Sequence, residues 1–303
     1  MGRSEPRSVP DVCEVSVRDP IGDARGWLLV EVPHGATRTA DYNRVAARLK
    51  SPLPPDLIHF FYVNTDIGAP EAASWLESEL PRHGIGVVFV RCLFPRTFID
   101  PNRVIPTERS SGAVVDGITP GLAPYITHPD DVAYLTELHR QYHAVVDRAY
   151  EVVCDERSGL ALALHSFAPR SVGIETVDDR IVEALHAAYE PSVYATWPER
   201  PPIDLICSLP DGSFHAAPSL HDALVHEYER DGIAAKKNET YALHPSTMGY
   251  LYAQRHPSQV LCVELNRGLV ASPFVPFGES PIDAAKVERM TAPIARVARA
   301  HFG

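Results

Sequence analysis

Residues 159–166 read Gly-Leu-Ala-Leu-Ala-Leu-His-Ser, an apolar run that stops at a histidine and a serine. A short continuous run of this kind predicts a strand that is buried on both faces, as in a parallel sheet covered by helices. Four further segments have the same character: residues 26–32, 86–90, 202–208 and 259–265. Together these runs predict the centre of a sheet.

Stretches with the helical spacing of apolar residues separate the predicted strands. They cover residues 41–49, 71–80, 129–152, 178–189, 220–229 and 281–302. Buried strands that alternate with helices predict an α/β fold built in layers. No repeat or low-complexity linker divides the chain, so we expect one domain over residues 1–303, in which residues 1–25 form an N-terminal extension or an edge strand.

Three segments are less regular. Residues 56–63 are apolar and fit a helix or a strand equally well, whereas residues 96–100 predict a further strand. Residues 101–125 are rich in glycine, proline and serine and have no sustained periodicity. Because a loop of this length inside a compact domain is usually functional, we expect a functional loop there.

The composition excludes several classes of protein. With 39 acidic and 28 basic side chains the net charge is −11, which repels nucleic acid on average. No stretch reaches the roughly 18 apolar residues of a membrane span, and the N-terminus lacks the apolar core of a secretory signal. The five cysteines are scattered and form no C-x-x-C pair, which favours a reducing compartment. We expect a cytoplasmic protein that acts on a small molecule, with no nucleic acid or membrane partner; its oligomeric state stays open.

Polar residues stand at the ends of predicted strands, which is where α/β proteins place their sites. His34 follows the strand at residues 26–32, His165 ends the run at residues 159–164, and Asp66 precedes a helix. Two imidazoles and a carboxylate can form a zinc site with an open position for water. A histidine after a strand can also be purely structural, and Asp66 can be a helix cap.

Glu264 stands inside the apolar run at residues 259–265. An ionised carboxylate in a buried strand is costly unless it is paired or functional, so this residue is a candidate proton acceptor. Asn102 and Arg103 follow the strand expected at residues 96–100. An arginine there could hold a substrate carboxylate in a bidentate fork, or it could be a surface residue of a turn.

A second histidine pair stands on the helix expected at residues 129–152. His139 and His143 are four residues apart and share one helix face, where two imidazoles could bind a metal. The zincin glutamate is missing between them, so packing is the simpler interpretation. The chain also has no G-x-S-x-G elbow and no Walker loop.

Taken in chain order, several short motifs form a set. They are Val32-Pro33-His34-Gly35, Asn64-Thr65-Asp66, Arg96-x3-Asp100-Pro101-Asn102-Arg103, Leu164-His165-Ser166 and Val263-Glu264-Leu265-Asn266-Arg267. From about residue 28 to 270, this set resembles the N-formylglutamate amidohydrolase family, which is related in fold to the zinc carboxypeptidases. The resemblance implies a three-layer α/β/α fold around a mixed sheet, of the phosphorylase/hydrolase-like kind. It also implies one catalytic zinc ion (Zn2+) and hydrolysis of an N-acyl amino acid.

The resemblance also implies a role for each matching residue. Three would bind the zinc ion: His34, Asp66 and His165. Glu264 would be the general base and acid. Three would bind the substrate, with Asn102 and Arg103 on its α-carboxylate and Arg96 as a second anion contact.

The sequence departs from the family pattern at a few positions. Ala163 stands where the family has an aspartate two residues before the histidine of the His-Ser motif, so a residue that orients a ligand is missing or replaced. Residues 35–37 replace a small polar turn, and Met248-Gly249 replaces a Gly-Gly loop before the last strand. Another N-acyl amino acid, a modified peptide or a secondary metabolite fits these departures as well as formylglutamate.

Two hypotheses from other classes remain open. Ala163 and the altered loops are compatible with a non-catalytic protein that binds an acidic metabolite on the same scaffold. The second hypothesis is a metal-free hydrolase that uses Ser166 or a cysteine as its nucleophile, although no sequence signature of a paired base and nucleophile accompanies these residues. Chelator-resistant turnover would favour the second hypothesis.

Overall fold

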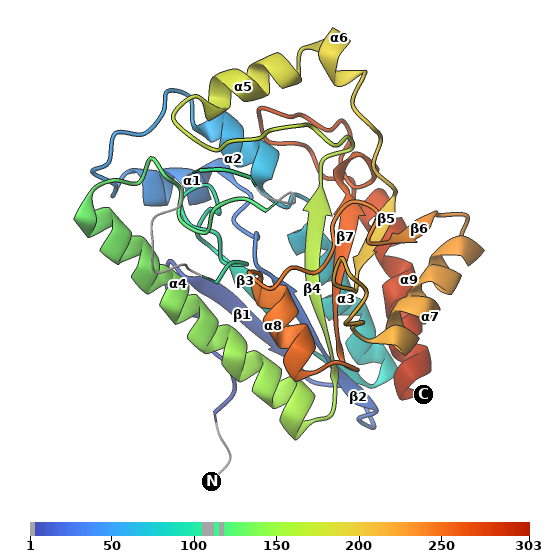
Figure 1. Ribbon diagram of the computed structural model, residues 1–303. Coiled ribbons are helices and arrows are strands. Elements are labelled where there is room, and N and C mark those ends of the chain that lie inside the picture. The colour runs from blue at the N-terminus through green and yellow to red at the C-terminus, as the bar shows by residue number, and fades with distance from the viewer. Residues whose placement is uncertain (1–3, 105–111, 115–117) are drawn as a thin grey trace.

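The computed structural model describes residues 4–104, 112–114 and 118–303. Within these residues, seven strands form one mixed sheet in the order β1-β3-β2-β4-β7-β5-β6 (Figure 1). The strands are β1 (Cys13–Arg18), β2 (Gly26–Val32), β3 (Ile85–Cys92), β4 (Leu160–Phe167), β5 (Ile203–Ile206), β6 (Ala235–Lys237) and β7 (Val260–Asn266). The central strands β3, β2, β4 and β7 are parallel, while β1 and β5 run antiparallel to β3 and β7.

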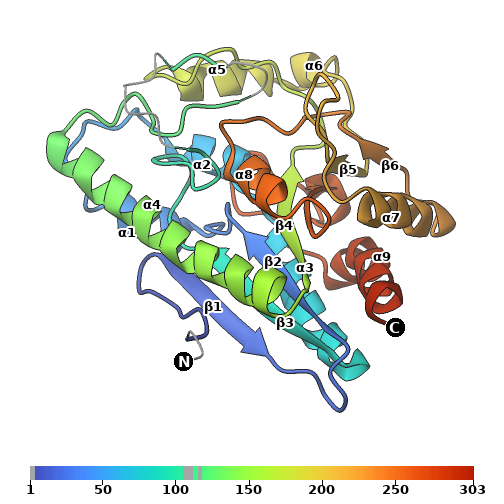
Figure 2. The ribbon, with the colours of Figure 1, turned by 60° about the horizontal axis from the view of Figure 1, so that its bottom comes forward.

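Helices cover both faces of the sheet (Figures 1 and 2). They are α1 (Thr39–Ala46), α2 (Ile58–Asn64), α3 (Ala69–Glu79), α4 (Pro129–Tyr150), α5 (Ile181–Ala188), α6 (Pro191–Tyr194), α7 (Pro218–Arg230), α8 (Met248–Arg255) and α9 (Ala284–Phe302). Short helical turns follow α3, α4 and β7 at Leu80–His83, Glu151–Glu156 and Arg267–Leu269. The expected α/β fold, with three layers around a mixed sheet, is confirmed.

The side chains of β2 show how the two cores form. Leu28 and Val30 point to one face, where they pack in a cluster with residues of α3, α7 and α9. Leu29 points to the other face and joins a cluster with residues of α2, α4 and α8. Because successive strand residues alternate between faces, a strand covered on both sides must be apolar throughout. This explains the continuous apolar runs from which the sheet was predicted.

Two segments whose sequence is less regular, residues 56–63 and 96–100, adopt different structures. The ambiguous residues 56–63 contain the start of helix α2 (Ile58–Asn64), and Phe61 of that helix is fully buried. The strand predicted at residues 96–100 is wrong: the segment is a turn, in which Ile99 makes one isolated bridge to Leu122. Prolines at positions 95 and 101 flank the segment and lack the amide donors of a ladder, and its apolar side chains are buried by packing.

Three elements were not predicted from the sequence, namely β6, α6 and α8, whereas β1 lies within residues 1–25, for which an extension or an edge strand was expected. The three residues of β6 include two exposed lysines, so no apolar run marks the strand. In the long loop expected at residues 101–125, the described residues contain no helix or strand, and residues 105–111 and 115–117 lie outside the described part. All five cysteines are free and buried. No helix in the described part of the chain is long and apolar enough to cross a bilayer.

Candidate active site

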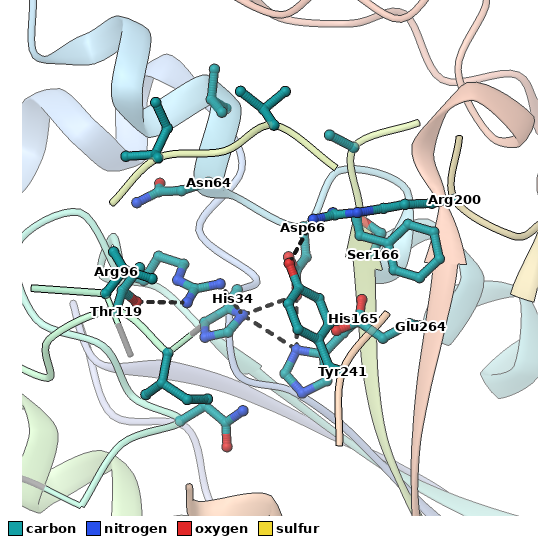
Figure 3. A pocket seen from close by; sticks show the side chains of 18 of the residues that line it. His34, Asn64, Asp66, Arg96, Thr119, His165, Ser166, Arg200, Tyr241 and Glu264 are labelled. Atoms are coloured by element: carbon teal, nitrogen blue, oxygen red, sulfur yellow. Dashed lines mark hydrogen bonds and ion pairs between the residues drawn. The ribbon is translucent and has the colours of Figure 1, made fainter. Parts of the chain in front are cut away.

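The candidate residues lie where parallel strands end (Figure 3). His34 comes two residues after β2, and His165 lies near the end of the neighbouring strand β4. In the parallel pairing of β4 with β7, His165 stands directly beside Glu264. The carboxyl ends of parallel strands meet at one edge of the sheet, so sequence positions far apart converge there.

His34, Asp66 and His165 form a buried triangle. Oδ2 of Asp66 lies 3.0 Å from Nδ1 of His34 and 2.9 Å from Nδ1 of His165, and the two nitrogens are 3.3 Å apart. Zinc with bonds of about 2.0–2.1 Å in tetrahedral geometry separates its ligand atoms by about 3.3 Å. The triangle therefore has the dimensions of one face of such a site. Among the described residues, this is the group of histidine and acidic side chains that could hold a metal ion.

The proton positions that the neighbours of His34 and Asp66 favour would also suit a bound cation. Nε2 of His34 lies 2.8 Å from Oδ1 of Asp100, a carboxylate that would hold the imidazole proton on Nε2 and free the lone pair of Nδ1 when a cation replaces the contact between Nδ1 and Asp66. Burial opposes ionisation of Asp66, but the two imidazoles outweigh it and hold its pKa below the usual range. The donor set is thus two nitrogen atoms and an anionic oxygen, which zinc prefers.

Asp100 is the centre of an ion-pair network behind His34. Its Oδ2 accepts a hydrogen bond of 2.7 Å from Arg96 and lies 3.7 Å from a guanidinium nitrogen of Arg103, while its Oδ1 accepts from the backbone amide of Asn102. Burial raises the pKa of Asp100, but Arg103 and Arg96 reverse this effect and hold it well below its usual range. Asp100 is therefore an anion that fixes the orientation of His34.

We expect Asp100→Asn to weaken zinc binding by about 10–100-fold, because the amide keeps the shape but loses the charge that orients the His34 imidazole. Competition with a chromogenic chelator measures the zinc affinity of both proteins. The exposed Asp130 provides the control variant Asp130→Asn, which should leave the affinity unchanged. Equal affinity in Asp100→Asn and the wild-type protein would contradict this role.

Arg267 holds the other oxygen of Asp66. Its Nη2 lies 3.2 Å from Oδ1 of Asp66 and donates to the carbonyl of Ser166 at 2.8 Å, and its Nη1 donates to the carbonyl of Val63. The guanidinium is buried. From its position after β7, it connects the end of α2 and the strand β4 to the carboxylate of Asp66. The sequence placed Arg267 in a motif but indicated no role for it.

Glu264 points toward the triangle from the neighbouring strand (Figure 3). Its Oε2 atom is inaccessible to solvent and has no hydrogen-bond partner in the described part of the chain. Burial raises the pKa of Glu264 to about 7, an effect that His165 opposes and Asp66 reinforces. A buried oxygen without a partner is costly, so Glu264 is a candidate for a role beyond packing.

The three residues expected to bind substrate line the same cavity of about 280 Å³ as the histidines. Nη1 of Arg96 lies 3.2 Å from Nδ1 of His34. Asn102 accepts a hydrogen bond from the backbone amide of Gly249, and Arg103 donates to the carbonyl of Thr119. The fold thus brings all seven candidate residues to one cavity, and their individual roles stay predictions.

Arg200 and Tyr241 also line this cavity, and no sequence pattern pointed to them. The guanidinium of Arg200 donates to the Tyr241 hydroxyl at 2.9 Å and to Oγ of Ser171 at 3.0 Å. It also lies over the ring of Phe167, 5.3 Å from the centroid. Within the described part of the chain it forms no salt bridge, which leaves a cation beside the site. Its segment has no regular structure, so only the tertiary fold reveals it.

A buried carboxyl group stands beside Ala163, the position where the family has an aspartate. Glu31 of β2 is in register with Ala163 of β4 and is 3% exposed. Its carboxyl oxygens accept hydrogen bonds from the hydroxyls of Tyr142, at 2.9 Å, and Tyr150, at 3.1 Å. Burial raises the pKa of Glu31 above its ordinary value of 4.5. The strand next to Ala163 therefore carries a carboxyl group that favours its neutral form.

The stability of the fold should depend on the proton of Glu31. A raised pKa in the folded state gives a stabilisation that is complete below the unfolded pKa and is lost as the pH rises through the folded one. Glu31→Gln cannot ionise. We therefore expect its free energy of unfolding, compared with that of the wild type at the same pH, to increase as the pH rises from about 5 to about 8. Urea unfolding at the two pH values measures this. An identical pH dependence of the two proteins would show that the carboxyl group is not responsible.

The remaining candidates have structural partners. His139 and His143 do meet, with their Nε2 atoms 3.2 Å apart, but His139 also bonds the carbonyl of Arg103 at 2.9 Å. Burial lowers the pKa of both imidazoles, that of His143 to about 3, so they form a neutral hydrogen-bonded pair. Ser166 donates to the carbonyl of Ile67, and no imidazole in the described part of the chain hydrogen-bonds its hydroxyl, which speaks against a serine nucleophile.

A sequence model of the N-formylglutamate amidohydrolase family matches residues 27–271. The chain belongs to this family. Its members are hydrolases that act on carbon–nitrogen bonds other than peptide bonds, and this confirms the resemblance found in the sequence motifs. No curated protein sequence matches the chain.

Two solved structures that align with this chain at a TM-score above 0.5 share its fold. The N-formylglutamate amidohydrolase from Ralstonia eutropha JMP134 aligns with 94% of this chain and 96% of its own, with 20% identity and a TM-score of 0.54. A gene product from Agrobacterium tumefaciens aligns with 94% of this chain and 92% of its own, with 18% identity and a TM-score of 0.54. A metallo-carboxypeptidase from Burkholderia cenocepacia aligns with 95% of this chain and 60% of its own, with 11% identity and a TM-score of 0.40.

Proposed function

We propose that the protein is a zinc-dependent amidohydrolase that cleaves the amide bond of a carboxylate-bearing N-acyl amino acid. The observation that carries the proposal is the buried triangle of two nitrogens and one oxygen, 2.9–3.3 Å apart, beside the unpartnered oxygen of Glu264. His34, Asp66 and His165 would hold the ion. Bound zinc supplies a Lewis acid that polarises a carbonyl oxygen and makes water more acidic near neutral pH.

Glu264 would move the proton. As a carboxylate it accepts a proton from the attacking water, and as a carboxylic acid it returns that proton to the amide nitrogen, which leaves as an amine. A pKa of about 7 suits both steps, because the group is then neither too weak a base nor too weak an acid. Its Oε2 has no competing hydrogen bond in the described part of the chain, so it is free for this transfer.

The arginines would bind and orient the substrate. Arg96 reaches His34 at 3.2 Å, so its guanidinium lies within hydrogen-bond reach of a carbonyl oxygen beside the triangle and would stabilise the charge that develops there. Asn102 and Arg103 would bind the α-carboxylate of the substrate. Asp100 keeps Arg96 and Arg103 in place, since it contacts both.

Metal analysis and a substrate screen test the proposal together. We expect about one zinc per chain after reconstitution, and chelator-sensitive hydrolysis of at least one N-formyl or N-acyl amino acid. Protein that takes up no zinc but binds an acidic metabolite would instead support a non-catalytic binding protein. Hydrolysis that survives complete metal removal would support a metal-free hydrolase. Either result would overturn the proposal.

Three broader expectations accompany this function. We propose that residues 1–303 act as one catalytic domain, with residues 1–25 contributing the edge strand β1. We further propose a cytoplasmic location and a small molecule as the partner, rather than nucleic acid or a membrane. Fractionation of cells that make the protein would test the location.

A further inference from the structure

We propose that the cavity beside the metal ligands contains an apolar subsite, and that the preferred substrate carries an apolar group next to the scissile amide instead of a second carboxylate. This proposal rests on the proposed amidohydrolase function and names its substrate class. The apolar group can belong to the amino acid, as a side chain, or to the acyl part, as a chain. Both have the same chemistry, and the experiment below separates them.

The apolar subsite has three walls. Helix α2 contributes Phe60 and Val63, the segment after β4 contributes Val172, Ile174 and Val177, and helix α5 contributes Leu185. Helices α2 and α5 pack against each other and lie beyond the end to which β4 points (Figure 1). Because these side chains line the same cavity as His34 and His165, an apolar group attached to the reacting amide can leave water by entering the subsite.

Every arginine that lines the described part of this cavity, apart from Arg200, already contacts a carboxylate. Arg96 and Arg103 contact Asp100, and Arg267 contacts Asp66. A further cation, Arg170, pairs with Glu199. A substrate with two carboxylates would need a second free cation, and none of the residues that form the three walls is charged.

Arg200 could instead favour a substrate with a second carboxylate, because it is a cation of the cavity that forms no salt bridge among the described residues. In Figure 3 it lies on one side of Asp66, where it donates to the Tyr241 hydroxyl, whereas Asn64, at the end of α2, lies on the other side. A substrate that placed a side-chain carboxylate on Arg200 would leave the α2–α5 walls unused. The two arrangements therefore predict different substrate preferences.

The experiment compares matched substrates on the zinc-loaded full-length protein. N-formylglycine is the reference, N-formylleucine extends the amino acid, N-hexanoylglycine extends the acyl part, and N-formylglutamate adds a carboxylate. We expect kcat/KM to rise at least about tenfold over the reference in one of the two apolar arms, since each buried methylene is worth about fourfold. N-formylglutamate should have a lower kcat/KM than the favoured apolar substrate. A preference for N-formylglutamate that Arg200→Met abolishes, or no gain in either apolar arm, would overturn the proposal.

Variants of the walls give a second test. Val172 is half-buried on a segment without regular structure, so Val172→Asp should fold and should lower kcat/KM for the favoured apolar substrate at least about tenfold. Leu185→Ala should act in the same direction, and in both variants the loss should be larger for the apolar substrate than for N-formylglycine. Val193→Asp, at an exposed position outside this cavity, is the matched control. Equal losses on N-formylglycine and the apolar substrate in both variants would contradict the subsite.

A binding measurement separates the subsite from the reaction. Calorimetry on the zinc-loaded Glu264→Gln protein should give at least about tenfold tighter binding of N-acetylleucine than of N-acetylglutamate, reduced by Val172→Asp. If this holds but no N-acyl amino acid is hydrolysed by the unmodified protein, the amidohydrolase proposal fails and the subsite stands. If N-formylglutamate is hydrolysed best, the subsite fails and the amidohydrolase stands.

Discussion

Glu264→Gln should lower kcat for amide hydrolysis by about 10²–10⁴-fold while the protein still binds zinc. The amide has the size of the carboxylate, so the packing of β7 against β4 and β5 is kept, but it can neither accept nor return a proton. Because Glu264 is not one of the three ligand residues, the metal should remain. Single-turnover hydrolysis of the best substrate and zinc analysis of the same sample measure the two quantities.

The pH dependence of Glu264 supplies an independent readout. Burial raises its pKa to about 7, and the base acts in its ionised form, so kcat/KM should fall as the pH drops through the pKa that this group has in the zinc-loaded protein. A bound cation favours the ionised form and shifts this limb to lower pH. Glu264→Gln should remove the limb. Glu71→Gln, on α3 and outside the cavity, is the control, because Glu71 also has a buried carboxyl oxygen without a partner in the described residues. Full activity in Glu264→Gln would exclude the carboxylate as the base.

The central strands and the position of the two histidines at one edge of the sheet could be predicted from the sequence for one physical reason. A strand covered on both faces must be apolar, so a polar side chain at its end stands out and marks the edge where parallel strands meet. His34 and His165 were found in this way. Asp66 lies on a turn before α3, where no strand ends; it stood out as a polar residue before a helix, and the family motif gave it the expected role of carboxylate ligand.

Other parts of the site depend on contacts that no local pattern encodes. Arg200 reaches the cavity from a proline-rich segment, and Tyr241 is placed there because Asp204 of β5 accepts hydrogen bonds from the amides of residues 239 and 240. The role of Arg267 depends on its contact with Asp66, 201 positions away in sequence. The wrong strand at residues 96–100 has a related cause, since its apolar side chains are buried by packing and not by a sheet.

His165→Ala should remove zinc from the protein and, with it, the hydrolytic activity. The substitution deletes one of the three proposed ligand atoms and leaves Nδ1 of His34 and Oδ2 of Asp66 without their common partner. Loss of a residue that only orients a ligand costs about 10–100-fold in metal affinity, so loss of the ligand itself should cost more than about 100-fold. Zinc content after dialysis against a weak chelator, measured by elemental analysis, gives the affinity independently of any substrate.

Thermal unfolding gives the same prediction a readout that does not depend on activity or on retained metal. Zinc that binds the folded state alone stabilises the wild-type protein by about 4 kcal/mol when its free concentration is about 1,000 times Kd, so added zinc should raise Tm. In His165→Ala the same zinc concentration should leave Tm almost unchanged. His226→Ala, at an exposed position of α7, should respond to zinc like the wild type, which controls for the loss of an arbitrary histidine. If His165→Ala bound zinc and gained stability as the wild type does, the metal would have to lie elsewhere, and the triangle of His34, Asp66 and His165 would be a hydrogen-bonded cluster of the sheet edge.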